Sequence, residues 1–74
     1  MAVKMYATID ELRDKLKSLG FVKANSTVER WTLGDTVVTI REDHIGIDRP
    51  HYRREFIRAK GGLILAIEAL DAMI

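Results

Sequence analysis

The chain has 74 residues, with 12 basic and 11 acidic side chains, a formal net charge of +1 and no cysteine. This length fits one domain, and the lack of cysteine excludes thiol catalysis and cysteine-ligated zinc or iron–sulfur sites. No long apolar run follows the N-terminal residues, and the apolar C-terminal run is shorter than the roughly 20 residues that a membrane span needs. We therefore expect a single small domain over residues 1–74, located in the cytoplasm and without a membrane partner.

The first clear element is a helix that begins after Thr8 and ends before Gly20. Thr8 and Glu11 form a capping box, in which each side chain satisfies the other residue's amide. Apolar residues then recur at helical spacing: Ile9, Leu12, Leu16 and Leu19. Gly20 suits the left-handed position after the helix, where Phe21 packs back onto it. Residues 1–7 alternate weakly, as in a short edge strand or a loose arm.

Residues 27–33, 36–41 and 44–48 are rich in strand-forming side chains and predict a three-stranded antiparallel meander. Gly34-Asp35 joins the first two strands as a two-residue hairpin turn, because glycine supplies the positive φ at the first position. Residues 21–26 are compatible with a short strand that runs into a turn.

For residues 49–60 the pattern favours a helix over a strand. Asp48 suits the N-cap and Pro50 the first turn. Apolar side chains then recur at i, i+4 and i+7: Tyr52, Phe56 and Ala59. A strand would instead place four side chains on one face: Tyr52, Arg54, Phe56 and Arg58.

Residues 63–74 predict a last helix that is apolar on almost every side, with Glu68 and Asp71 as its charged residues. Such a helix needs cover on more than one side, so we expect a homodimer built around it. The predicted fold is α+β: an N-terminal helix, a three-stranded antiparallel meander and one or two C-terminal helices packed on the sheet. The expected core consists of Val28 or Trp31 together with Leu12, Leu16, Val38, Ile40, Leu65 and Leu70.

The basic side chains are concentrated between residues 49 and 60. This segment holds Arg49, Arg53, Arg54, Arg58 and Lys60 against one acidic residue, Glu55, whereas the remainder of the chain is net negative. Uneven placement of this kind is typical of an anion-facing surface. Tyr52 and Phe56 lie among these arginines, and such a mixture suits single-stranded nucleic acid through phosphate contacts and base stacking. The simpler alternative is a solvated face with both aromatic rings in the core.

Gly61 and Gly62 lead directly into the last helix, whose start has no Ser, Thr, Asp or Asn cap. Helix N-termini bind anions because their first amides are unpaired and the helix dipole is positive there. We therefore expect a phosphate or a partner's carboxylate at Gly61 and Gly62. The alternative is a plain Gly62 N-cap with water on the amides.

No motif for catalysis or for a cofactor is present. The two histidines, His44 and His51, match no metal-ligand spacing, and the G-x-S-x-G, H-E-x-x-H and G-x-G-x-x-G patterns do not occur. The sequence thus predicts a non-enzymatic binding module without a cofactor, which binds nucleic acid through residues 49–60. The alternative is a small inhibitor or adaptor that acts on an acidic protein partner.

The order helix, three strands, helix resembles that of double-stranded-RNA-binding domains and of HicA-type toxins. Residues 16–21, followed by residues 25–27 and Trp31, are similar to the front half of the HicA pattern. HicA toxins carry a catalytic histidine where this chain has Thr27. The RNA-binding domains carry a lysine cluster before the last helix, where this chain has Lys60. The resemblance implies an arrangement of elements rather than an activity.

Overall fold

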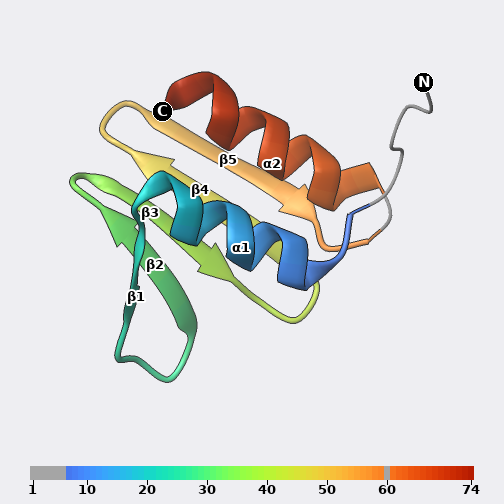
Figure 1. Cartoon of the computed structure of the whole chain (residues 1–74), viewed down its shortest axis with the longest axis horizontal. Coiled ribbons are helices and arrows are strands. Elements are labelled where there is room, and N and C mark those ends of the chain that lie inside the picture. The colour runs from blue at the N-terminus through green and yellow to red at the C-terminus, as the bar shows by residue number, and fades with distance from the viewer. Residues whose placement is uncertain (1–6, 60) are drawn as a thin grey trace.

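The computed structural model describes residues 7–59 and 61–74. In chain order the elements are α1 (Ile9–Leu19), β1 (Val22–Ala24), β2 (Glu29–Leu33), β3 (Thr36–Ile40), β4 (His44–Arg49), β5 (Tyr52–Ile57) and α2 (Gly61–Met73). The strands form one antiparallel sheet in the order β1-β2-β3-β4-β5. Both helices lie on the same face of this sheet and run side by side (Figure 1). The weakly alternating residues 1–6 and Lys60 lie outside the described residues.

The expected α+β class is confirmed, with a helix at each end of an antiparallel sheet. The expected number of strands was wrong: in the described part of the chain the sheet has five strands, not three. One extra strand is β1, which pairs with β2 from Val22 opposite Thr32 to Ala24 opposite Arg30. The other is β5, in the segment for which a helix was preferred. Among the described residues, neither helix has the length and apolar character needed to cross a membrane.

Helix α1 begins and ends where the sequence predicts. The Thr8 hydroxyl accepts a hydrogen bond from the Glu11 amide at 3.2 Å. At the other end Gly20 takes φ 99°, and the Phe21 amide donates to the Leu16 carbonyl at 2.9 Å. This six-to-one hydrogen bond, with the one from Gly20 to Lys17, is a Schellman motif, which glycine accommodates without a Cβ penalty.

Residues 52–57 form a strand, so the helix preferred for this segment was wrong. Pro50 and His51 are not a helix start but a two-residue hairpin loop, because Arg49 pairs directly with Tyr52 across it. His51 takes φ 63°, which together with the fixed φ of proline is the pattern of a type II turn and stops any helix there. The four-residue spacing of Tyr52 and Phe56 fits one face of a strand as well as one face of a helix.

The core lies between the helices and the sheet. Six expected core residues are buried: Leu12, Leu16, Trp31, Val38, Ile40 and Leu70. The expectation for Leu65 was wrong, because its side chain is 51% exposed. Helix α2 instead buries Leu63, Ala66 and Leu70, which share one side of the helix, while Leu65 projects from the opposite side. Val28, the alternative to Trp31, is half-buried.

Candidate nucleic-acid interface

The β4–β5 hairpin divides the predicted basic segment between the two faces of the sheet. Across the hairpin Arg49 pairs with Tyr52, and Ile47 pairs with Arg54. Directly opposed residues share a face, so Arg49, Tyr52 and Arg54 all lie on the side of the sheet that carries the helices. Arg53 lies on the opposite face, with its cross-strand partner Asp48. The arginines therefore do not form one continuous surface.

Arg53 is neutralised on its own face. Its Nε lies 3.4 Å from Oδ1 of Asp48, and its Nη2 lies 3.9 Å from Oε1 of Glu55. The Arg53 side chain is 76% exposed, and exposed ion pairs of this kind contribute little to stability. Even so, two carboxylates next to one guanidinium leave no excess positive charge at Arg53.

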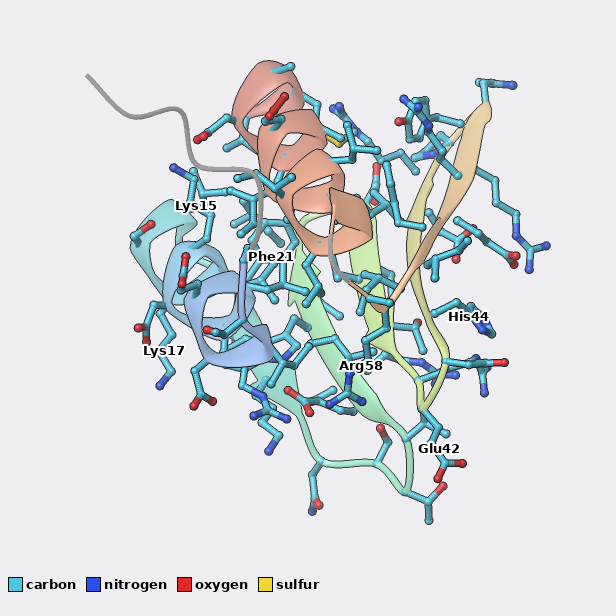
Figure 2. All side chains as sticks on the ribbon, turned by 90° about the vertical axis from the view of Figure 1, so that its right-hand side faces the viewer. Lys15, Lys17, Phe21, Glu42, His44 and Arg58 are labelled. Atoms are coloured by element: carbon cyan, nitrogen blue, oxygen red, sulfur yellow. The ribbon has the colours of Figure 1, made fainter. Side chains whose placement is uncertain are left out.

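Arg58 lies at the far end of β5, beside the loop that joins β3 to β4. Its amide donates to the Asp43 carbonyl at 3.0 Å, and its guanidinium donates to the Arg41 carbonyl at 2.9 Å. Figure 2 shows Arg58 at the same end of the molecule as Glu42 of that loop. Arg58 thus fixes the loop through two backbone carbonyls. Lys60 lies outside the described residues.

Gly61 and Gly62 begin α2 at the same end of β5 as Arg58 (Figure 1). The Gly62 amide donates to the Ala59 carbonyl at 2.9 Å. A Cβ at Gly62 would lie 1.8 Å from the carbonyl oxygen of Ile57, far closer than non-bonded heavy atoms can approach. The close approach of the β5 backbone therefore explains the glycine at position 62.

A groove of about 560 Å³ opens at the other end of the sheet. There the β2–β3 turn and the β4–β5 turn meet the end of α2 (Figure 1). The groove is lined by Leu33, Asp35, Thr36, Arg49, Pro50, Tyr52, Met73 and Ile74. The Arg49 guanidinium donates to the Met73 carbonyl at 3.4 Å, where a cation also interacts favourably with the negative end of the helix dipole. Arg49 and Tyr52 are the groove residues that the sequence had marked.

Arg54 follows Tyr52 along the same face of β5. Its guanidinium carbon lies 4.9 Å from the centroid of the Phe56 ring, a cation–π contact that leaves the arginine exposed. Among residues 7–59 and 61–74, neither Arg49 nor Arg54 forms an ion pair with a carboxylate. We call Arg49, Tyr52 and Arg54, with the groove beside them, the arginine groove.

The other residues that line this groove could not be predicted from the sequence. Leu33 and Asp35 come from the β2–β3 turn and Met73 from the end of α2, so they meet Arg49 only through the order of the strands and the placement of the last helix. No local pattern links these positions. Asp35 brings one carboxylate to the groove that Arg49 also lines.

The histidines do not assemble into a metal site within the described part of the chain, where no group of three or more possible ligands is close enough together. His44 points away from the helices, as Figure 2 shows, and its Nδ1 lies 2.6 Å from Oδ1 of Asp43. That contact lowers the pKa of Asp43. His51 lies in the β4–β5 turn next to the groove.

A polar cluster joins α1 to β2, and it was not predicted from the sequence. The Glu29 carboxylate accepts from Arg13 Nε at 2.9 Å, from Arg13 Nη2 at 2.8 Å and from the Trp31 indole at 2.9 Å. These hydrogen bonds, chiefly those from Arg13, lower the pKa of Glu29 from 4.5 to about 2. The carboxylate in turn raises the pKa of Arg13. All three hydrogen bonds join side chains of this chain, which marks the cluster as structural.

Comparison with known proteins gives no assignment. The chain matches no protein-family model, and searches of curated proteins and of solved structures returned no significant match.

Proposed function

We propose that this chain is a non-enzymatic binding module that takes single-stranded nucleic acid in the arginine groove. The observation that carries the proposal is the placement of Tyr52 between two guanidinium groups, Arg49 and Arg54, that share its face and have no carboxylate partner among the described residues. An aromatic ring between cations offers a base a stacking surface and its flanking phosphates two charge-assisted hydrogen bonds.

The proposed site is narrower than the basic segment. Arg53 is neutralised by two carboxylates, and Gly62 is packed against β5. Arg58 is half-buried and holds the β3–β4 loop at 2.9 Å, whereas Arg49 is exposed and its contact with the Met73 carbonyl is longer, at 3.4 Å. The proposal therefore assigns phosphate contacts to Arg49 and Arg54. It assigns none to Arg53, Arg58, Gly61 or Gly62.

The test is fluorescence anisotropy with labelled single-stranded DNA and RNA and with their duplexes, at several salt concentrations. We expect tighter binding of the single strands, with an affinity that falls as salt rises because phosphate contacts release counterions. Arg49→Gln and Arg54→Gln should each weaken binding about tenfold and reduce the salt slope by about one. Tyr52→Leu, which keeps an apolar side chain, should also cost about tenfold through lost stacking.

Arg30→Gln is the matched control. Arg30 is an exposed arginine of β2 that lies opposite Thr39, on the face of the sheet away from the helices. The substitution removes the same charge. A loss of affinity equal to that caused by Arg54→Gln would therefore show that net charge, not the groove, drives binding. Absence of binding to all four probes at low salt would refute the proposal.

A second candidate is an acidic protein partner, which would bring carboxylates to the same two guanidinium groups. The half-exposed Leu65 on α2 favours it, because protein interfaces combine arginine and tyrosine with apolar surface. A purified chain with a low 260/280 absorbance ratio, no affinity for oligonucleotides and specific capture of an acidic protein would support this candidate. The sequence also predicts a homodimer and a cytoplasmic location, and we propose both for this chain.

A further inference from the structure

Strand β5 ends the sheet, and no other described strand lies beyond it. The amide of Arg58 donates to the carbonyl of Asp43, so the backbone at this position points toward the β4 side. In an antiparallel ladder the backbone groups of alternate residues point to the same neighbour. The N–H and C=O groups of Arg53 and Glu55 therefore point to the free side of β5, whereas the Ile57 carbonyl on that side lies against Gly62. The edge of β5 from Tyr52 to Phe56 is a template for another strand.

The side chains beside this edge suit a second copy of the same strand. Arg53, Glu55 and Ile57 share the face away from the helices, and all three are well exposed. If two β5 strands pair antiparallel about a two-fold axis at Arg54, Arg53 of each copy lies opposite Glu55 of the partner subunit. An axis at Arg53 or at Glu55 would instead oppose like charges on this face. Directly opposed pairs of opposite charge stabilise a sheet, and like charges weaken it.

The helix-side face is compatible with the same register. Tyr52 of one copy would lie opposite Phe56 of the partner subunit, and aromatic cross-strand pairs are favourable. Arg54 would face its own counterpart, which is unfavourable. Each Arg54 guanidinium, however, is exposed and lies over its own Phe56 ring. The register thus brings two ion pairs and two aromatic pairs against one repulsive contact.

Helix α2 presents an apolar flank on the same side. Asp71 forms an ion pair with Lys15 of α1, which marks the flank that faces α1. Gly62 packs against the Ile57 carbonyl, which marks the flank above β5. Leu65 and Ala69 follow Gly62 at i+3 and i+7 and so lie toward this second flank, where Leu65 is 51% exposed. Two copies joined along β5 would bring these two flanks together.

We propose that two copies of the chain pair antiparallel along β5, with Arg53 of each copy opposite Glu55 of the partner subunit and the two α2 helices side by side. The result is a dimer with one continuous ten-stranded sheet. This inference rests on the proposed homodimer and specifies its interface. It does not depend on nucleic-acid binding.

The test uses charge reversal and sedimentation velocity over a range of concentrations, with circular dichroism to confirm that each variant is folded. We expect the wild type to sediment as twice the 8.4 kDa chain. Arg53→Glu and Glu55→Arg should each raise the dimer dissociation constant at least tenfold. Each substitution places like charges at both crossings, the two places where residue 53 of one copy faces residue 55 of the partner subunit. Arg30→Glu, a charge reversal on the same face but away from β5, should leave it unchanged.

Mixing the two reversed variants gives the decisive result. Arg53→Glu carries two acidic residues at positions 53 and 55, and Glu55→Arg carries two basic ones, so a mixed pair has opposite charges at both crossings. We expect the equimolar mixture to form heterodimers although neither variant alone dimerises. A wild-type dimer that tolerates both reversals would overturn the β5 pairing and leave the homodimer to another surface. A wild type that is monomeric at all concentrations would overturn both the β5 pairing and the homodimer.

Discussion

Replacement of Glu29 by glutamine tests the energetics of the α1–β2 connection. The substitution keeps the size of the side chain and one carbonyl oxygen but removes the negative charge that binds Arg13 through two hydrogen bonds. Glutamine also presents an NH₂ group, and this group would face a guanidinium N–H where the carboxylate had an acceptor. We expect Glu29→Gln to lower the free energy of unfolding at pH 7.

The magnitude follows from the pKa of Glu29, which falls from 4.5 to about 2 on folding. One pKa unit corresponds to about 1.4 kcal/mol, and the Glu29 side chain is 18% exposed, so we expect about 2–3 kcal/mol. Because the folded-state pKa lies below the unfolded value, this contribution is complete above pH 4.5. It is lost as the pH falls from about 4.5 toward 2.

The assay is urea denaturation followed by Trp31 fluorescence and by circular dichroism, at pH values from 7 down to 2.5. The wild-type advantage over Glu29→Gln should be constant between pH 7 and 5 and should shrink below 4.5. Glu42→Gln, at an exposed loop position, is the control and should change stability by less than about 0.5 kcal/mol. An equal loss for both variants, or a wild-type advantage that does not depend on pH, would refute the assignment.

Two further substitutions test the backbone. Gly62→Ala should destabilise the fold by about 2 kcal/mol or more, despite the better helix propensity of alanine, because its Cβ would meet the Ile57 carbonyl. Gly46→Ala, with open space around it, should be neutral or slightly stabilising in the same urea assay. Equal effects at the two glycines would contradict this account. His51→Gly should stabilise the fold by about 0.5–1 kcal/mol because it relieves a positive φ, and His51→Ala should give no such gain. An equal gain from both would show that the imidazole, not the backbone, is responsible.

The elements that the sequence predicted well are those fixed by local chemistry. The ends of α1 depend on Thr8, Glu11 and Gly20, all within a few residues of the hydrogen bonds they make. The Gly34-Asp35 turn likewise depends on one glycine, which takes φ 58°. Strand β5 could not be assigned with the same security, because Tyr52 and Phe56 lie four residues apart and four is close to a whole number of periods in both structures. What decides between them is pairing with β4, a contact between segments.

The sequence showed the composition of the candidate site but not its geometry. The sequence shows that arginines are dense between residues 49 and 60, and the structure then divides them by the alternation of a strand. Arg53 and Arg54 are neighbours in sequence and lie on opposite faces of the sheet. The partners that neutralise or occupy an arginine, such as Asp48 for Arg53 and the Arg41 carbonyl for Arg58, belong to other elements. Only the tertiary structure shows which cations lack a carboxylate.

The two proposals bear on each other through Arg54. In the dimer joined along β5, this residue would meet its own counterpart on the helix-side face, which is the one repulsive contact of that register. The same face carries Arg49 and Tyr52, so pairing would align two arginine grooves end to end. The two α2 helices, which the same pairing places side by side on this face, would lie over the junction of the grooves and cover the opposed Arg54 guanidinium groups. A ligand that binds one state more tightly shifts the equilibrium toward that state. Nucleic acid that contacts Arg54 would therefore favour the monomer, and dimerisation would in turn weaken its binding.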